Sequence, residues 1–133
     1  MGLGMAANVA RRLGHTRKVP LGTSRKFWYS DDLSEPMSSI TSPDVEKRLY
    51  VDPRMLPLLE GRRVVLVDDV ASSGRTVGAV LRLLERAGVR PVALAFAMLQ
   101  GQQWHDEVGD LPVVAALRTP LLRRDGDTWV PEA

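Results

Sequence analysis

Two adjacent carboxylates follow an apolar run in the stretch VVLVDDVASSGRT. The apolar run ends at Val67, the acids are Asp68 and Asp69, and a loop of small residues leads on to Thr76. Two like charges at the end of a buried strand repel each other, so turn formation alone gives them little reason to be there. Carboxylates in this position can bind hydroxyl groups or a metal-bound ligand. We interpret the pair as part of a binding site, with ordinary turn formation as the alternative.

The residues after the pair have the composition of an anion-binding loop: Ala71, Ser72, Ser73, Gly74, Arg75 and Thr76. Small side chains let backbone N–H groups converge on an anion, and a helix N-terminus adds a favourable dipole. The alternative is that a hydroxyl of the loop only caps the helix. Neither the spacing of a P-loop nor a Gly-x-Gly-x-x-Gly after a strand occurs. The pattern therefore favours a sugar phosphate, whose hydroxyls contact the acids while its phosphate lies in the loop.

Hydrophobic periodicity predicts the elements that position this loop. Residues 63–67, 91–99 and 112–117 are short apolar segments without alternation, which is typical of parallel strands buried on both faces. Amphipathic helices are predicted at 4–13 and 76–87. Strand, helix and strand with short connections indicate a right-handed βαβ unit. We predict an α/β fold with a parallel, Rossmann-like sheet and helices on both faces, whose ligands bind beyond the carboxyl ends of the strands.

The remaining segments are less regular. Residues 22–53 show no sustained period and are expected to form a flexible active-site loop or hairpin, with some strand pairing at its base. Residues 53–59 are expected to form a short helical turn, and residues 101–109 a polar connection. The tail, residues 118–133, is predicted to contain a small hairpin turned at Asp125-Gly126 and to serve as a hood over the site.

Length and composition exclude several function classes. The 133 residues fit one domain, 1–133, and a net charge of only +2 argues against a nucleic-acid partner. The lack of cysteine excludes disulfides and thiolate metal sites. No apolar run approaches the ~20 residues that span a bilayer, and no signal peptide is recognisable. We expect a cytoplasmic protein without a membrane partner.

The stretch VVLVDDVASSGRT resembles the phosphoribosyl-pyrophosphate (PRPP) motif of the type I phosphoribosyltransferases. That motif has an apolar run, two acids, a few small residues and a closing Thr. Residues 2–14 are similar to the first helix of the family, and Ser24-Arg25-Lys26 is similar to the basic end of its second strand. The resemblance covers most of residues 2–99. It implies the type I phosphoribosyltransferase fold and transfer of the 5-phosphoribosyl group from PRPP to a nucleobase, with adenine favoured, and release of pyrophosphate.

The resemblance also implies roles for residues. Asp68 and Asp69 would be catalytic and would bind the ribose hydroxyls, directly or through Mg²⁺, and residues 71–76 would hold the 5′-phosphate. Lys26, the third catalytic candidate, would meet the pyrophosphate together with Arg25. Apolar and aromatic side chains could contact the base, and the candidates are Trp28, Leu117 and Trp129. Members of this family are commonly dimers, so a homodimer is expected.

Two departures from the family pattern leave alternatives open. In the branch of the family that acts on 6-oxopurines, the position that matches Ser72 is an Asp, which is credited with acid/base catalysis. This sequence has Ser there. The strand and pyrophosphate loop that the family places ahead of its first helix have no counterpart, so we expect that the sequence either begins late or is a truncated form. The alternatives to an enzyme are a PRPP-sensing regulatory protein of the same fold without turnover, and a partner subunit that uses an amine from elsewhere.

Overall fold

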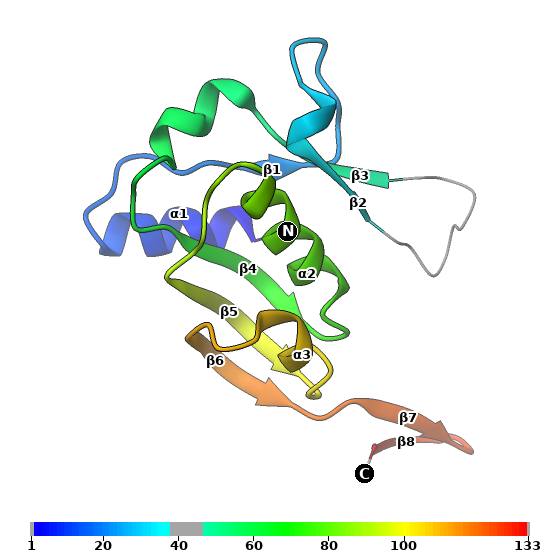
Figure 1. Ribbon diagram of the computed structural model, residues 1–133. Helices are drawn as coiled ribbons and strands as arrows, with labels where there is room; N and C mark the ends of the chain where they lie inside the picture. Colours follow the sequence, from blue (N-terminus) through cyan, green and yellow to red (C-terminus); the bar gives the residue numbers. More distant parts are fainter. Residues whose placement is uncertain (1, 38–46, 133) are drawn as a thin grey trace.

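Two three-stranded sheets lie on either side of one helix in the computed structural model, which describes residues 2–37 and 47–132. The helix is α2 (Arg75–Arg86), and a two-stranded hairpin extends from the end of one sheet (Figure 1). Both hydrophobic cores contain residues of α2. The helix therefore ties the two sheets together.

The first sheet is parallel, with the strand order β4-β5-β6. Its strands are β4 (Val65–Ala71), β5 (Ala93–Gln100) and β6 (Val113–Thr119). Helix α2 connects β4 to β5, and the short helix α3 (His105–Val108) lies between β5 and β6, within the stretch predicted to be a polar connection. The predicted α/β fold class and the βαβ unit are confirmed.

Strand β4 is longer than the sequence predicts. Its pairing with β5 continues past the apolar run, with Asp68 opposite Phe96 and Ala71 opposite Leu99. The prediction that the acids follow the strand is therefore wrong, because the cross-strand pairing keeps the backbone extended through both of them. The loop between β4 and α2 shrinks to residues 72–74.

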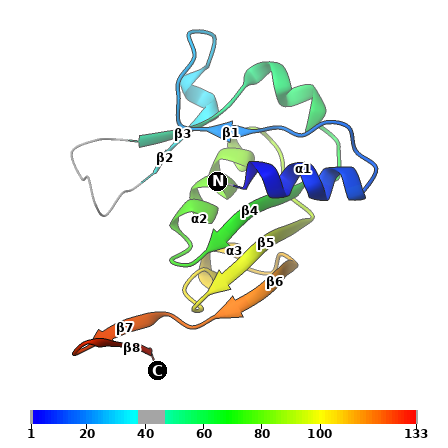
Figure 2. The same cartoon turned by 180° about the vertical axis from the view of Figure 1, so that it is seen from behind.

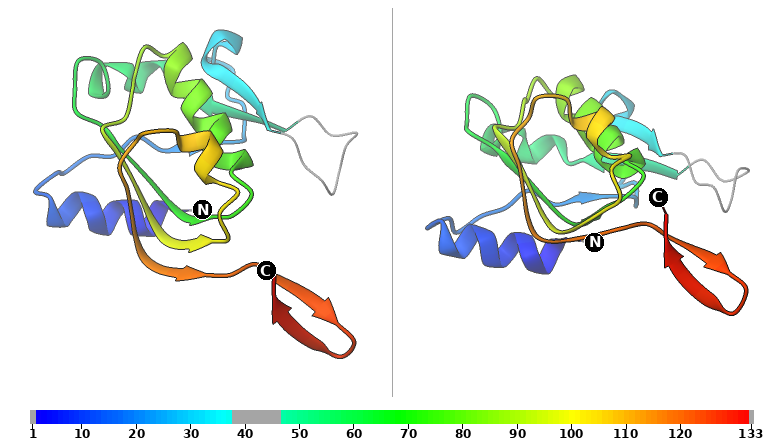
Figure 3. Two further views of the ribbon diagram at one scale, coloured as in Figure 1. Left: turned by 60° about the horizontal axis from the view of Figure 1, so that its bottom comes forward. Right: turned by 90° about the horizontal axis from the view of Figure 1, so that it is seen from below.

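The helices cover the faces of the parallel sheet unequally. Helix α1 (Leu3–Arg12) lies beside β4, whereas α2 and α3 lie on the opposite face (Figures 2 and 3). Leu94 and Phe96 of β5 are almost fully buried against the α2 face. On the other side Val114 of β6 is 60% exposed and Leu117 is 51% exposed. The prediction that every strand is buried on both faces is wrong for β6, which α1 does not cover (Figure 3).

The second sheet lies within the segment predicted to be a flexible loop. It is antiparallel, in the order β1-β3-β2, with the strands β1 (Leu21–Gly22), β2 (Ser34–Met37) and β3 (Lys47–Val51). The 3₁₀ helices η1 (Asp31–Leu33) and η2 (Pro53–Leu58) flank it. The predicted strand pairing and the helical turn are confirmed. Residues 38–46 of the predicted loop lie outside the described residues.

The C-terminal hairpin consists of β7 (Leu122–Asp125) and β8 (Thr128–Pro131). Its turn contains Gly126 at φ 61°, as the Asp-Gly signal predicts. The hairpin extends away from the body of the protein (Figures 1 and 3), so it does not cover the end of β4. In the described part of the chain, no helix is both long and apolar enough to cross a membrane.

Candidate ligand-binding site at the end of strand β4

The two acids of β4 are half-buried and tied to the backbone. Asp68 Oδ1 accepts hydrogen bonds from the N–H groups of Gly2, at 3.0 Å, and of Asp69, at 2.9 Å. Asp69 Oδ1 accepts one from the N–H of Val70 at 2.9 Å. These bonds fix the direction of both side chains before any ligand arrives. The sequence predicts the acids, but not that the start of α1 would meet one of them.

Gly2 can approach Asp68 because it has no side chain. A Cβ built on Gly2 would lie 2.5 Å from the Cα of Asp68, closer than any van der Waals contact allows. Helix α1 therefore begins directly against the acidic pair. Packing of α1 along β4 holds the pair in place from one side.

The loop at residues 72–74 ends in a glycine that is required for two reasons. Gly74, the residue before α2, has φ 84°, a left-handed conformation that disfavours other residues. A Cβ at Gly74 would also lie 2.8 Å from Glu107 Cγ and 3.0 Å from Trp104 Cα. The loop can make this close turn into α2 only with glycine at that position.

The N-terminus of α2 has little capping from side chains. Gly74 supplies no side-chain hydrogen bond to the helix, and Ser73 Oγ accepts only a long 3.4 Å bond from the N–H of Arg75. Ser73, Arg75 and Thr76 are exposed. Because the first N–H groups of a helix lack intrahelical partners, this end offers donors and a positive dipole to an anion. If the loop served only to cap the helix, its side chains would contribute just this one weak hydrogen bond from Arg75 to Ser73.

An ion-pair cluster joins the antiparallel sheet to α2. Glu35 of β2 is only 5% exposed, and its carboxylate accepts hydrogen bonds from Arg82 Nε at 2.7 Å and Arg86 Nε at 2.9 Å. Burial opposes ionisation of Glu35, but the two arginine hydrogen bonds outweigh it and hold its pKa below the ordinary value. The cluster fixes α2, and with it the loop, relative to β2.

The structure does not bring the predicted pyrophosphate residues next to the loop. The segment that contains Arg25, Lys26 and Trp28 rises from the end of β1, far from the end of β4 (Figures 1 and 2). Arg25 pairs with Asp31 at 2.8 Å, and Lys26 is exposed. The roles of Arg25 and Lys26 at pyrophosphate stay a prediction that this arrangement does not support.

Trp28 is part of a different cluster. Its indole N–H donates to Asp52 Oδ2 at 3.2 Å, and the Arg54 guanidinium lies 4.2 Å from the centre of its ring. The side-chain hydrogen bond from Arg54 opposes the effect of burial and lowers the pKa of Asp52 to about 2. Trp28 thus has a structural role at the outer end of the antiparallel sheet, which its aromatic character in the sequence did not reveal.

Of the other base-binding candidates, Leu117 lies in the same parallel sheet as the acidic pair, two strands away, and Trp129 lies on the C-terminal hairpin. Register pairs Val70 with Met98 and Met98 with Leu117, so these three residues form an apolar row across the carboxyl half of the parallel sheet, beside Asp69. Val70 and Leu117 are partly exposed, at 37% and 51%. Trp129 is 65% exposed on the projecting hairpin.

A neighbouring hollow was not predicted. It has a volume of about 970 Å³ and is lined by residues 101–105 and 118–121, among others. A Cβ built on Gly74 would lie 3.0 Å from Trp104 Cα and 3.5 Å from Gln103 O, two residues of the same lining. Within the described residues, Thr119 Oγ1 is buried there without a hydrogen-bond partner. The position of these segments after β5 and β6, at the carboxyl ends of parallel strands, is the signal that could have found the hollow.

Known proteins share this fold. The structure is similar to crystal structures of adenine phosphoribosyltransferase from Thermoanaerobacter pseudethanolicus, with a TM-score of 0.70 and 24% identity over 88% of this chain and 64% of that one. For the enzyme from Rhodothermus marinus the TM-score is 0.67 and the identity 27%, over 86% of this chain and 62% of that one. These similarities confirm the predicted type I phosphoribosyltransferase fold.

Curated relatives match in sequence. An adenine phosphoribosyltransferase of Desulforamulus reducens is 40% identical over 62 residues, which are 46% of this chain and 36% of the relative. A bifunctional protein PyrR of Pseudomonas putida is 34% identical over 113 residues, 84% of this chain and 56% of the relative. The chain thus spans about a third to a half of the length of these relatives. The family model of the phosphoribosyl transferase domain matches residues 1–114, and the chain therefore belongs to the phosphoribosyl transferase family.

Proposed function

We propose that this chain binds PRPP at the end of β4 and transfers its 5-phosphoribosyl group to a nucleobase, with release of pyrophosphate. The strongest support for this proposal is that three features follow one another within a short stretch of the chain. Two backbone-anchored carboxylates, a three-residue loop and an uncapped helix N-terminus follow one another from Asp68 to Thr76. Membership of the family supplies the reaction class.

Each part of the site has a distinct role in the proposal. The N–H groups at residues 72–76, with the hydroxyls of Ser72, Ser73 and Thr76, hold the 5′-phosphate. Asp68 and Asp69 hold the ribose hydroxyls. The bond between the anomeric carbon and the pyrophosphate oxygen breaks, and its electron pair leaves with pyrophosphate. A bond from the acceptor nitrogen to that carbon forms, and the nitrogen loses its proton to solvent.

The protein contributes chiefly positioning and electrostatics to this reaction. Positive charge develops at the anomeric carbon as pyrophosphate leaves, and the carboxylates of β4 stabilise it. Because Gly2 and the strand backbone already orient Asp68, little reorganisation is needed at the moment of reaction. None of Ser72, Ser73 and Gly74 has an acid or base in its side chain, so the loop positions the substrate and does not move protons.

The residues present fit a Mg²⁺ ion held jointly with PRPP. No group of three or more His, Cys, Asp or Glu side chains in the described ranges could hold a metal unaided. Mg²⁺ commonly binds through one or two carboxylates together with the oxygens of a phosphorylated substrate, and Asp68 and Asp69 supply such carboxylates. When bound, the ion would neutralise charge on the departing pyrophosphate.

The apolar row Val70, Met98 and Leu117 is the proposed floor for the acceptor. Strands lie about 4.8 Å apart, so the row spans roughly 10 Å, which matches a flat base. Val70, at one end of the row, directly follows Asp69 in the chain. The names of the relatives favour adenine. A homodimer remains a prediction based on the resemblance, and a cytoplasmic location remains one based on the composition and the lack of a recognisable signal peptide.

The experiment supplies PRPP, Mg²⁺ and a panel of purine and pyrimidine bases to the purified chain and measures pyrophosphate release. Release with one base, adenine first, supports the proposal. Calorimetry with PRPP runs in parallel. Binding without release for any base would instead support the regulatory alternative, which is relevant because the longer of the two sequence matches is to a bifunctional protein PyrR. Absence of PRPP binding would contradict both.

A further inference from the structure

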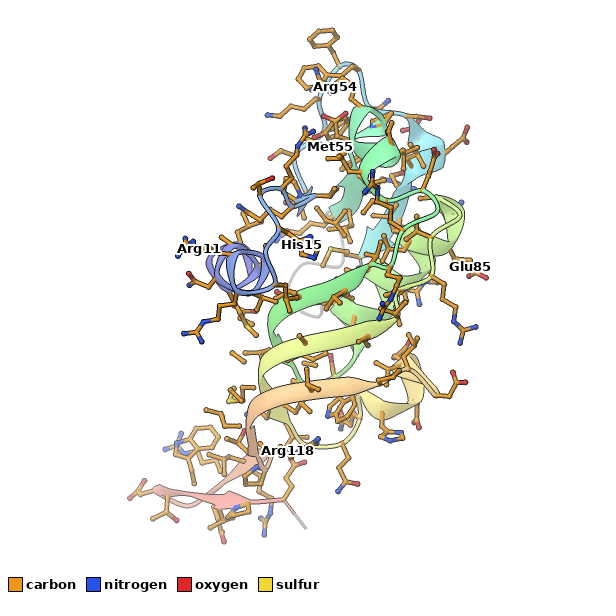
Figure 4. All side chains as sticks on the ribbon, turned by 90° about the vertical axis from the view of Figure 1, so that its left-hand side faces the viewer. Arg11, His15, Arg54, Met55, Glu85 and Arg118 are labelled. Atoms are coloured by element: carbon orange, nitrogen blue, oxygen red, sulfur yellow. The ribbon has the colours of Figure 1, made fainter. Side chains whose placement is uncertain are left out.

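A basic hollow lies at the end of α1 that is remote from Asp68. It has a volume of about 570 Å³, and its lining comes from α1, from the link after α1 and from η2. The lining residues are Ala7, Ala10, Arg11, His15, Thr16, Arg17, Lys18 and Met55. Figure 4 looks along α1 and shows Arg11 on the helix, His15 beyond its end and Met55 on η2 above them.

The charges around the hollow have one sign. Arg11, Arg17 and Lys18 are cationic, and the described residues of the lining include no carboxylate. Within the described ranges, 2–37 and 47–132, no acidic side chain forms an ion pair with Arg11, Arg17 or Lys18. Within the part of the chain that the structure describes, the side chain of Arg11 donates one hydrogen bond, to Asn8 Oδ1 at 3.3 Å. Cations gathered in this way repel one another, and a multivalent anion would relieve that repulsion.

Helix electrostatics explain part of this cluster but not all of it. Arg11 lies in the last turn of α1, where a cation interacts favourably with the helix dipole. Arg17 and Lys18 lie beyond the helix and gain nothing from it. They reach the same hollow because the chain turns after Gly14, at φ 79°, and runs back toward η2.

The shape of the hollow favours a small ligand. Three separate segments surround it, and Ala7, Ala10 and Met55 give it an apolar floor. A nucleic-acid site would need a basic stripe across the surface, and the chain as a whole carries a charge of only +2. We propose that the basic hollow binds a phosphate-bearing small molecule, independently of the site on β4. The lining residue of α1 nearest to that site is Ala7, five residues after the Gly2 that contacts Asp68, which is about 7.5 Å along the helix.

The two histidines of the chain make the test specific. His15 lines the hollow, whereas His105 begins α3 on the other face of the parallel sheet. Inorganic pyrophosphate is titrated into the whole chain while the imidazole resonances of both residues are followed by NMR. We expect the His15 resonances to move and saturate. His105 lies 5.4 Å from Trp104, beside the loop of the site on β4, so a shift of its resonances reports pyrophosphate at that site, and a shift of His105 without one of His15 would overturn the proposal. Sodium chloride at matched ionic strength should move neither.

A pair of matched variants then tests the charges. Arg17→Ala/Lys18→Ala should weaken the binding seen at His15 by roughly tenfold or more, because charge-assisted hydrogen bonds to phosphate are lost. Arg62→Ala/Arg63→Ala removes the same charge from an exposed pair outside the hollow and should change it less than about twofold. The proposal is overturned if His15 does not respond, if both variants weaken binding equally, or if short single-stranded RNA moves His15 and pyrophosphate does not.

Discussion

The backbone N–H of Gly2 donates to Asp68 Oδ1 at 3.0 Å, across 66 residues of sequence. This contact joins the first turn of α1 to the middle of the proposed PRPP site. It exists only because Gly2 has no Cβ, which would meet the backbone of Asp68. The position of α1 and the direction of the Asp68 carboxylate are therefore coupled.

Gly2→Ala should weaken PRPP binding by about tenfold, because the added methyl group pushes the start of α1 away from Asp68. Calorimetry with PRPP measures the change. Gly4→Ala is the control on the same helix, since a Cβ there meets nothing within 4 Å. It should stabilise α1 by roughly 0.5–1 kcal/mol and leave PRPP affinity unchanged. Equal affinity of the two variants would contradict the coupling.

Asp68→Asn/Asp69→Asn should remain folded and lose PRPP affinity by about a hundredfold. The amide oxygens of Asn can still accept the backbone hydrogen bonds, so the fold loses little, but the charges that hold ribose and Mg²⁺ are gone. Thermal denaturation checks folding and calorimetry checks binding. Asp125→Asn/Asp127→Asn removes the same charge from the exposed hairpin and should bind PRPP normally. A folded Asp68/Asp69 variant with unchanged affinity would remove the ribose assignment.

Gly74→Ala should reduce both stability and phosphate binding. The left-handed φ of 84° costs a non-glycine residue roughly 1–2 kcal/mol, and the new methyl group would meet Glu107 and Trp104. Because α2 would have to shift, its first N–H groups would leave the position where they meet the 5′-phosphate. Chemical denaturation measures the loss of stability, and the PRPP dissociation constant measures the loss of phosphate binding. A control is Gly88→Ala, which has a similar φ of 71° and nothing within 4 Å; it should lose stability but not PRPP affinity.

The sequence predicts the parts of this fold that depend on local pattern. The βαβ unit follows from apolar strands and an amphipathic helix, and the acidic pair and the small-residue loop are visible as a motif. The extent of β4 depends on pairing with Phe96, Met98 and Leu99 of another strand, which no local pattern encodes. The ion pairs of Glu35 could not be predicted from the sequence, because its partners Arg82 and Arg86 lie 47 and 51 residues away.

The base-binding role of Trp28 stays a prediction that the fold does not support, for a similar reason. A tryptophan beside basic residues is compatible with a base-stacking role, and only the fold shows that Asp52 and Arg54 occupy it. The apolar row of Val70, Met98 and Leu117 depends on register across three strands. Leu117 was a candidate from the tail of the sequence, but its neighbours could not be known.

The cluster around Asp52 should unfold locally in acid. Arg54 holds the folded pKa of Asp52 at about 2, below the ordinary value of 3.8. A depressed carboxyl pKa stabilises the fold above the unfolded pKa and stops doing so as pH falls through the folded one. The indole N–H resonance of Trp28 should therefore shift between pH 4 and about 2. Asp52→Asn should abolish this transition, whereas Asp106→Asn should keep it; a transition that persists in Asp52→Asn would exclude Asp52 as its cause.

Leu117→Ala should raise the KM for the acceptor base by roughly three- to tenfold and leave the KM for PRPP unchanged. The loss of about half of its apolar contact with a flat base accounts for an effect of this size, on the order of 1 kcal/mol. Trp129→Ala and Trp28→Ala serve as comparisons, because the first side chain projects on the hairpin and the second is bound to Asp52. Steady-state kinetics with varied base at saturating PRPP gives the KM for the base, and kinetics with varied PRPP at saturating base gives the KM for PRPP. If Trp28→Ala raised the KM for the base and Leu117→Ala did not, the acceptor would lie on the segment after β1, and the apolar row would have no part in binding it.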